Sequence, residues 1–557
     1  MKNSKSKIIY IVSALVIVII VNVIGNNFHK RFDLTKDNRY TLSETTTDII
    51  DPADSPLIID IFLEGDLPSE FKLLQTETKQ LIEEFQTINP LIKVNYIDPL
   101  ADEANRDNII KELTKTGLEP YINSKKVSGK VTQELLFPWG FASYKGKTVK
   151  IPLFKKSITE DLQTQVSNSV QQLEYNFADA FEQLTKEKSK TVAVLKGNGQ
   201  LSDIYIADFL QTIKPYYNLA QFTLDSVATN PISTLKKLKN YDLIISAKPN
   251  EAFTENEKLV LDQYTMSGGK SLWLTEAISM DKDSLYNEAG TSVSIGKELN
   301  LTDFFFQYGV RINQNLVKDL YSAPIPLAIG EGNNRQFQPV QWQYSPLAKA
   351  SEKNPISDNI DLVKFDFASQ IDTLKNSIKK TLLLQSSERT KLESPLQNIS
   401  LASVTKAPDE ENYNQGKQNL AVLLEGEFNS VYKNRILPFE IDNFIETSKP
   451  TKMVVISDGE VIKNEVWRNR PVQLGFERIT GRTFGNKEFL LNTVNYLLDD
   501  TGLINIRAKS VEIAFLDSEK IEEQKGTWQF INLALPLLLL AIFGIAFNFI
   551  RKRKYAK

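Results

Sequence analysis

The feature that most constrains this chain is an apolar run near its C-terminus, Phe530 to Phe549, which contains no charged residue. A helix of this length is long enough to cross a hydrocarbon core of roughly 30 Å. Pro536 lies inside the run, and a membrane helix tolerates it as a kink because neighbouring groups satisfy the freed carbonyl. A soluble core helix is seldom apolar on every face and then followed at once by a cluster of cations. We therefore predict a transmembrane helix over residues 530–549.

A second charge-free apolar run, Ile8 to Ile24, follows the lysine-containing start of the chain. A cleaved signal peptide is the main alternative for such a run. The residues that follow it, Asn26, Asn27 and Phe28, are not the small residues of a cleavage site. We therefore favour an uncleaved transmembrane helix over residues 8–24.

The charges that flank the two runs predict how the chain crosses the membrane. Residues 1–7 and 550–557 are basic and contain no acidic residue, and basic flanks mark the cytoplasmic side. Both tails should therefore be cytoplasmic. The protein is then expected to be a two-pass protein of the cytoplasmic (inner) membrane, with the bulk of the chain in the periplasm.

Composition limits what this extracytoplasmic part can do. The chain has 66 Lys and Arg against 69 Asp and Glu, and the tails hold only cations, so the part between them is acidic and unsuited to nucleic acid. There is no cysteine, which excludes disulfides and thiol catalysis. The one histidine, His29, lies beside the first apolar run, so a multi-histidine metal centre and a histidine-based triad are excluded. We expect no metal and no cofactor.

The first extracytoplasmic domain is predicted over residues 28–186. Its strands and helices follow the order βαβ, α, ββ, α, which is typical of a thioredoxin-like domain, here without the redox cysteines. The first strand is mostly apolar and is expected to be buried on both faces. The expected elements are Leu57–Leu63 (strand), Pro68–Ile88 (helix), Leu91–Ile97 (strand), Asn108–Thr116 (helix), Leu135–Tyr144 and Lys147–Phe154 (hairpin), and Ile158–Thr185 (helix).

A second α/β domain is predicted over residues 189–505. Between about 319 and 449 the pattern is irregular and rich in proline, which indicates a β-rich insertion. Residues 506–527 should form a last strand, Val511–Leu516, and a charged stem. The main strands expected in this domain are Lys190–Leu195, Leu219–Leu224, Tyr241–Ser246, Lys270–Thr275 and Lys452–Ser457, and the main helices are Asp203–Ile213, Thr254–Met266 and Phe489–Leu498.

Two short segments in the second domain are candidate ligand sites. Gly197, Asn198 and Gly199 follow a strand and precede a helix, where free backbone amides can hold an anion. Ser202 stands where a dinucleotide-binding loop needs its third glycine, so a plain tight turn is favoured.

The second candidate is an acid pair, Asp458 and Glu460, which follows the strand Lys452–Ser457. Ligands of α/β sheets bind beyond the carboxyl ends of strands, and a glycosidase or a metal-assisted hydrolase can use two carboxylates. The favoured alternative is an Asp-Gly turn followed by an exposed Glu. No Gly-x-Ser-x-Gly motif supports a serine hydrolase.

A series of short motifs, in this order, resembles the gliding-motility ABC transporter auxiliary proteins, the GldG family. The resemblance covers essentially the whole chain, both apolar runs included. The motifs are Phe32-Asp33-Leu34-Thr35, Arg39-Tyr40-Thr41-Leu42-Ser43, Gly197-Asn198-Gly199, Tyr241-Asp242-Leu243-Ile244-Ile245, Ser267-Gly268-Gly269, Ile456-Ser457-Asp458-Gly459, Asn486-Lys487-Glu488-Phe489 and Trp528-Gln529.

The resemblance implies a membrane-anchored auxiliary subunit, often called substrate-binding by analogy, that works with a separate permease and ATPase in bacterial gliding or the associated secretion. It also implies that the second domain is similar to the class I glutamine amidotransferase-like fold. Enzymes with that fold use a cysteine nucleophile and a histidine base, and this domain contains neither. We therefore expect a protein that is not an enzyme.

The expected role is mechanical or scaffolding coupling to an ABC permease and its ATPase, with other envelope or motility proteins as further candidate partners. Small residues that allow helices to pack closely, Ala534, Ala541, Gly544 and Ala546, lie in the second membrane helix. Two alternatives remain open. One is a ligand-binding protein with a cleft between its two α/β domains, and the other is an extracytoplasmic hydrolase that uses Asp458 and Glu460.

Overall fold

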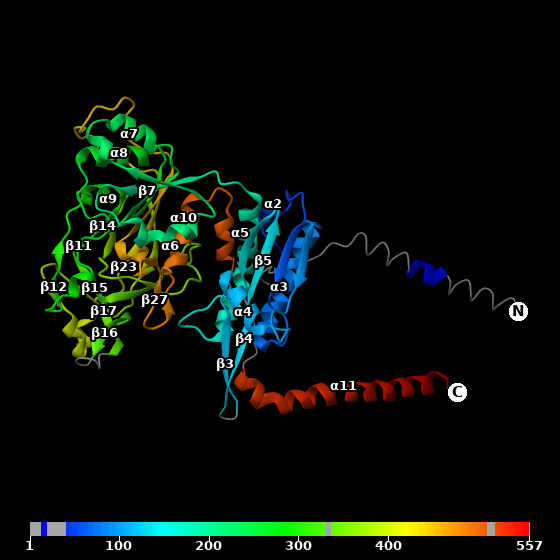
Figure 1. Ribbon diagram of the computed structural model, residues 1–557. Coiled ribbons are helices and arrows are strands. Elements are labelled where there is room, and N and C mark those ends of the chain that lie inside the picture. The colour runs from blue at the N-terminus through cyan, green and yellow to red at the C-terminus, as the bar shows by residue number, and fades with distance from the viewer. Residues whose placement is uncertain (1–12, 19–40, 128–129, 330–335, 510–517, 556–557) are drawn as a thin grey trace. The chain divides into compact units, whose positions relative to one another are not determined.

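The computed structural model describes residues 13–18, 41–127, 130–329, 336–509 and 518–555 (Figure 1). The chain divides into two compact units, Met1–Ser510 and Val511–Lys557. Each unit is described by itself below.

The N-terminal part of the first unit contains a four-stranded sheet with the order β2-β1-β5-β6. The first two strands are parallel, and β5 and β6 form an antiparallel hairpin. The predicted helices and strands occur in the predicted order, with helix α2 before them and one further hairpin among them, and the thioredoxin-like fold itself stays a prediction. The elements are α2 (Glu44–Ile50), β1 (Leu57–Ile61), α3 (Ser69–Ile88), β2 (Ile92–Tyr96), α4 (Arg106–Lys115), β5 (Trp139–Tyr144), β6 (Lys147–Pro152) and α5 (Leu162–Thr185).

Two features of this part differ from the prediction. Strand β1 is not buried on both faces, because Ile58 is 41% exposed while Ile59 is fully buried. Its buried face is shared with the apolar faces of α3 and α5, which contact each other. A second hairpin, β3 (Tyr121–Val127) and β4 (Lys130–Leu136), precedes β5. Its polar and lysine-rich sequence lacks the apolar alternation that marks a half-buried strand.

The remainder of the first unit is organised around a ten-stranded sheet. Five neighbouring strands, β24, β10, β9, β7 and β8, are parallel, and the strands on the other side of β24 are antiparallel. The strands are β7 (Thr191–Lys196), β8 (Asn218–Thr223), β9 (Leu243–Ala247), β10 (Lys270–Leu274), β16 (Ser322–Ile329), β17 (Gln336–Ala350), β18 (Val363–Lys364), β20 (Lys379–Gln385), β23 (Asn419–Gly426) and β24 (Thr451–Ile456).

Helices cover both faces of this sheet. Side chains of α6 (Asp203–Ile213) and α10 (Asn486–Leu498) pack in one core cluster, and those of α7 (Pro231–Leu238), α8 (Glu255–Met266) and α9 (Thr302–Tyr308) pack in another. Strand β7 contributes alternate residues to the two clusters. Burial on both faces explains why the parallel strands are continuous apolar runs.

The predicted β-rich insertion is part of this sheet, because β20 and β23 continue it beyond β24. Residues 360–367 contribute the two-residue strand β18 to it. Strand β17 was not predicted because Pro339 and Pro346 interrupt it, yet proline is tolerated where no ladder hydrogen bond is lost. The remaining short strands are β11 (Ile278–Ser279), β12 (Thr291–Val293), β13 (Ile295–Gly296), β14 (Val310–Ile312), β15 (Leu316–Asp319), β19 (Ile371–Thr373), β21 (Thr390–Glu393), β22 (Asn398–Ser400), β25 (Val466–Trp467), β26 (Arg470–Pro471), β27 (Phe476–Glu477) and β28 (Arg482–Thr483).

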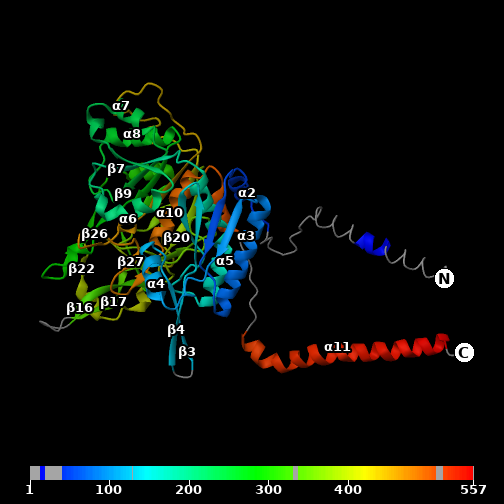
Figure 2. The same cartoon turned by 45° about the vertical axis from the view of Figure 1, so that its right-hand side comes forward.

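The four-stranded sheet is joined to the large one through α5, which lies between them in both views (Figures 1 and 2). Partly buried ion pairs cross this junction. Glu488, on α10, contacts Lys155 at 2.7 Å and Arg507 at 2.8 Å. Glu174, on α5, contacts Lys509 at 2.8 Å. The two parts of the first unit are thus tied by charged contacts as well as by apolar packing.

The second unit contains one long helix, α11 (Ser518–Tyr555), with Pro536 inside it. Glu523–Tyr555 is long enough to cross a membrane and contains an 18-residue stretch with a mean hydropathy of 2.5. The stem predicted before the apolar run is the first part of this helix. The strand expected over Val511–Leu516 lies outside the described residues. Of the N-terminal run over 8–24, only residues 13–18 are described, and they are helical.

Candidate functional site

Polar side chains from four segments gather at the carboxyl edge of the parallel strands. Asn198 follows β7, Lys248 follows β9, Glu276 follows β10 and Asp458 follows β24. All four are buried, with exposed fractions of 5% or less. The carboxyl edge of an open α/β sheet is where such folds place their ligands. The structure therefore brings both candidate segments named from the sequence to one edge.

The Gly197-Asn198-Gly199 segment forms a tight turn in which both glycines have positive φ, +110° and +67°. The backbone groups of Asn198 are engaged within the protein. The Asn198 N–H donates to Oε1 of Gln200 at 2.8 Å, and the Asn198 carbonyl accepts from the N–H groups of Asn250 and Glu251. The Asn198 N–H, one of the groups that could hold an anion, is thus already used.

Lys248 lies at the centre of a row of alternating charges. Its ammonium contacts Glu460 and lies 3.3 Å from Glu276. Glu276 contacts Lys297 at 2.7 Å, and Glu460 contacts Lys463 at 3.0 Å. Burial disfavours the charged form of Lys248, but the carboxylates of Glu276 and Glu460 outweigh this and raise its pKa. The row therefore ties together loops from three strands and the Lys297 segment.

The loop geometry brings Lys248 into this row. Its φ is +53°, in the left-handed region that non-glycine residues seldom adopt. Gly459 lies against it so closely that a Cβ at position 459 would be 2.5 Å from the Lys248 Cβ. The absence of a side chain at Gly459 thus allows the loops after β9 and β24 to meet. Sequence analysis missed Lys248, Glu276 and Lys297 because each belongs to a different loop.

Asp458 is fully buried and both of its carboxyl oxygens accept backbone hydrogen bonds. Oδ1 accepts from the N–H of Glu460 at 2.7 Å, and Oδ2 accepts from the N–H of Asp366 at 2.6 Å. Burial raises the pKa of Asp458 well above its usual value, and the charges of Glu276 and Asp366 raise it further. Asp458 caps the short 3₁₀ helix Gly459–Ile462 and orders the turn.

Glu460 is not the exposed residue expected from the sequence. Its side chain is 14% exposed and is paired with both Lys248 and Lys463. The acid pair is therefore arranged as one capping carboxyl and one ion-paired carboxylate. Each oxygen of the two carboxyl groups thus has a partner within the protein.

A cavity of about 370 Å³ opens beside this cluster. Asp366 lines it and pairs with Lys282 at 2.7 Å and with Lys364 at 3.6 Å. Tyr205 and Tyr286 lie at its rim and are partly exposed. Within the described ranges, no group of three or more His, Cys, Asp or Glu side chains is arranged to hold a metal ion. The cavity wall is thus largely polar, with exposed aromatic side chains and with ion pairs formed among its own residues.

The four small residues named as helix-packing candidates all lie in α11. Ala534, Ala541 and Gly544 are spaced by seven and three residues, which places them on one stripe of the helix. Ala546 lies about 120° from Ala534 around the axis, given about 100° per residue, and so belongs to another face. A Cβ added at Gly544 meets nothing within 4 Å in this unit.

Comparisons with known proteins show the family to which the chain belongs. A domain of unknown function (DUF7088) matches residues 36–143, and the family described as "ABC-type uncharacterized transport system" matches residues 189–493. An uncharacterized protein of Borreliella burgdorferi is 22% identical over 563 residues, and the match covers 100% of both chains. The solved mmIFT52 N-terminal domain is 13% identical with a TM-score of 0.31, covering 56% of this chain and 98% of that one, a similarity too weak to carry an argument. Because the transport-system match covers more than half of the chain, the protein belongs to this family of ABC transporter auxiliary proteins.

Proposed function

We propose that this protein is a membrane-anchored, extracytoplasmic auxiliary subunit of an ABC transporter that serves bacterial gliding motility or the associated secretion. The observation that carries the proposal is the family match over residues 189–493 on a chain that also contains α11. That helix ends in basic residues, as a cytoplasmic flank does. The predicted helix over 8–24 would be the second anchor.

The role we propose is coupling or scaffolding without catalysis. The carboxylates at the sheet edge are engaged in capping and in ion pairs, so they act as ties between loops. Glu488 and Glu174 tie the four-stranded sheet to the large one. A body held together in this way can pass on a movement of its membrane helices. ATP-driven motion of the permease would reach residues 41–509 through those helices.

The partners we propose are the ABC permease and its ATPase, with other envelope or motility proteins as further candidates. The permease would pack on the small-residue stripe of α11, because small side chains let two membrane helices approach closely. Ala541 and Gly544 are the central residues of that stripe.

The test compares three variants of the full chain in a detergent pull-down. Ala541→Leu and Gly544→Leu place a large side chain on the stripe, and Ala546→Leu makes the same change on another face. We expect recovery of the permease and ATPase to fall several-fold for the first two and to stay at the wild-type level for the third. Equal recovery from all three would contradict packing through the stripe.

A further inference from the structure

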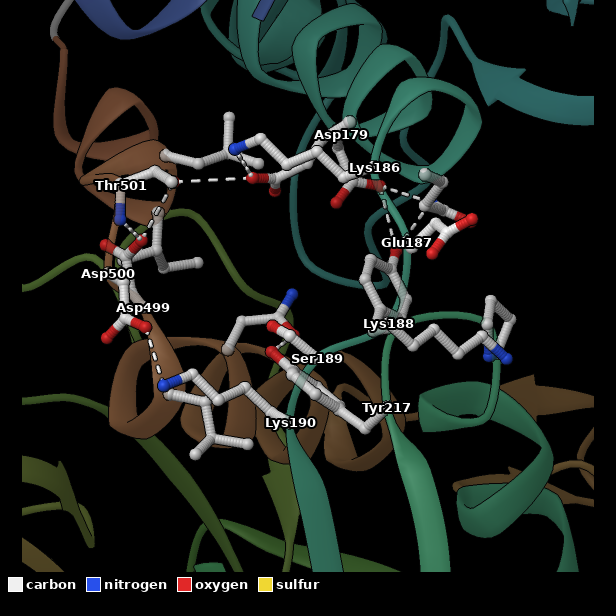
Figure 3. Close-up of a pocket in the computed structure, with 18 of the residues that line it drawn as sticks. Asp179, Lys186, Glu187, Lys188, Ser189, Lys190, Tyr217, Asp499, Asp500 and Thr501 are labelled. Carbon is white, nitrogen blue, oxygen red and sulfur yellow. Dashed lines mark hydrogen bonds and ion pairs between the residues drawn. The ribbon is translucent and has the colours of Figure 1, made fainter. Parts of the chain in front are cut away.

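The junction between α5 and the large sheet contains a pocket of about 170 Å³ that lies away from the carboxyl-edge site. Figure 3 shows Asp179 and Lys186 on the α5 side, Lys190 and Tyr217 on the side of the large sheet, and Asp499 to Thr501 along a third side. We propose that this pocket binds a compact organic cation, a small primary or quaternary amine. This inference goes beyond the transport role proposed above and does not depend on it.

In the described part of the chain, one carboxyl oxygen in this pocket, Oδ1 of Asp179, lacks a hydrogen-bond donor. Oδ2 of Asp179 accepts from the hydroxyl of Tyr216 at 2.8 Å and from Nε2 of Gln183 at 2.9 Å. Oδ1 is buried and has no hydrogen-bond partner among the described residues. A buried acceptor without a donor costs free energy, so native proteins seldom leave one unsatisfied. The N–H of a primary ammonium, or the hydroxyl of a quaternary one such as choline, would supply the missing donor.

The negative charge of the pocket wall also favours a cation. Five acidic residues and three lysines line the pocket, so the wall carries a net negative charge. The lysines are already engaged. Lys186 contacts Glu182 at 2.6 Å, Lys190 contacts Asp500 at 2.7 Å, and Lys188 donates to the Lys214 carbonyl. The acids that remain after these pairings, Asp179, Glu187 and Asp499, favour a cationic occupant.

The aromatic lining of the pocket favours a cation as well. Tyr175, Tyr216 and Tyr217 all line the pocket, and the ring centroids of Tyr216 and Tyr217 are 6.0 Å apart. Tyrosine faces attract ammonium groups within about 6 Å of the ring centroid. The guanidinium of Arg507 lies 5.1 Å from the Tyr175 ring centroid, so the Tyr175 ring already accommodates one cation. Ca²⁺ and Mg²⁺ prefer six or more oxygen ligands, which this aromatic wall does not offer.

The size of the pocket limits the ligand. An engineered cavity of about 150 Å³ accepts benzene, so a pocket of 170 Å³ suits a molecule of similar size. A chain of four carbons with an amine at each end has six heavy atoms and meets this limit. One amine would bind Oδ1 of Asp179, and the other would lie near Asp499 or Glu187.

The experiment titrates the purified full chain in detergent with 1,4-diaminobutane and with choline by isothermal titration calorimetry. Two molecules matched in size to the diamine serve as controls, neutral 1,4-butanediol and anionic succinate. Asp179→Asn removes the carboxylate at nearly constant shape, and Asp66→Asn makes the same change at an exposed residue outside the pocket. Thermal unfolding of each variant shows that it is folded.

We expect at least one of the two cations to bind and neither control to do so. Asp179→Asn should weaken binding at least tenfold, and Asp66→Asn should leave it unchanged. Binding needs an ionised Asp179, and a carboxyl group is about one-tenth ionised when the pH is one unit below its pKa. The affinity should therefore also fall about tenfold from pH 7.5 to pH 5. Burial raises that pKa to about 6, and the negative charge of Glu182 adds to this effect, whereas the Tyr216 and Gln183 hydrogen bonds and the charge of Arg507 oppose it.

Three results would overturn the proposal. The first is no binding of either cation at 10 mM, the second is equal binding of butanediol, and the third is unchanged affinity in a folded Asp179→Asn variant. None of these results bears on recovery of transporter subunits in a pull-down, so this proposal and the transport role fail or hold separately.

Discussion

We predict that Glu488 holds the junction between the two parts of the first unit, and Glu488→Gln tests this. Its carboxylate pairs with Lys155 at 2.7 Å and with Arg507 at 2.8 Å. The Arg507 side chain is 3% exposed, the Lys155 side chain 20% and the Glu488 side chain 29%. The glutamine variant keeps the shape and leaves two cations close together without a counter-charge.

The size of the effect lies between two limits. Removing one partner from a fully buried ion pair costs about 3–5 kcal/mol, and an exposed pair contributes about 0–1 kcal/mol. The Glu488 cluster is mostly buried but reaches solvent, so we expect Glu488→Gln to lower the free energy of unfolding by about 2–3 kcal/mol at pH 7.

The pH dependence has a defined sign. Burial alone would raise the pKa of Glu488, but the charges of Lys155 and Arg507 outweigh it and the net shift is downward. A lowered pKa of an acid adds stability above its value in the unfolded chain, about 4.3 for Glu. That stability is lost as the pH falls through the lower folded-state value. The difference between wild type and Glu488→Gln should therefore be full at pH 7 and shrink as the pH falls below about 4.

Urea unfolding of the full chain in detergent, followed by tryptophan fluorescence, measures the difference. Limited trypsin digestion adds a local readout, because loosening the junction should speed cleavage at the lysines of residues 186–190, which connect its two sides. Glu410→Gln is the matched control, since Glu410 forms an exposed pair with Arg389. A change below about 0.5 kcal/mol, or one equal to that of the control, would refute the claim that Glu488 holds the junction.

Three further predictions concern the other sites. Gly459→Ala should destabilise the protein by about 1–3 kcal/mol, because the new Cβ would meet Lys248 at 2.5 Å; a thermal melt that matches wild type would show that the two loops do not need this close approach. Burial raises the Asp179 pKa to about 6, so the free energy of unfolding of the wild type falls as the pH rises from about 4 to 6. Asp179→Asn should therefore raise the free energy of unfolding at pH 7, and a variant no more stable than wild type at that pH would contradict this. A reporter that works only in the cytoplasm should be active when it is fused after Lys557. Activity there of a reporter that works only outside the cytoplasm would reverse the predicted topology.

The sequence predicted the parallel part of the large sheet well because its strands are buried on both faces. Leu243, Ile244 and Ile245 in β9, and the run Met453–Ile456 in β24, are apolar without alternation. Short segments of this kind, separated by capped helices, indicate an α/β fold with little ambiguity. The same rule placed Asn198 and Asp458 at the carboxyl edge.

The rest of the site could not be predicted, because its contacts join distant segments. Lys248 and Glu460 are 212 residues apart, yet their side chains form an ion pair. The burial of Glu460 depends on that lysine, and no feature of the Glu460 loop itself predicts that burial. The pocket at Asp179 is a similar case, since Asp179 lies on an amphipathic helix where an acid usually faces solvent, and only packing of α5 against Tyr216 buries it.

Errors in the fold have local causes. The prolines of β17 disguise a strand of fifteen residues, and the apolar sequence of β1 does not reveal that one of its faces is partly open.

The measurement that tests the central claim most directly is a detergent pull-down of the tagged full chain from its native membrane, followed by mass spectrometry of the proteins that come with it. The account predicts recovery of an ABC permease together with its ATPase, in amounts comparable to the bait. Recovery of envelope or motility proteins without any transporter subunit would contradict it.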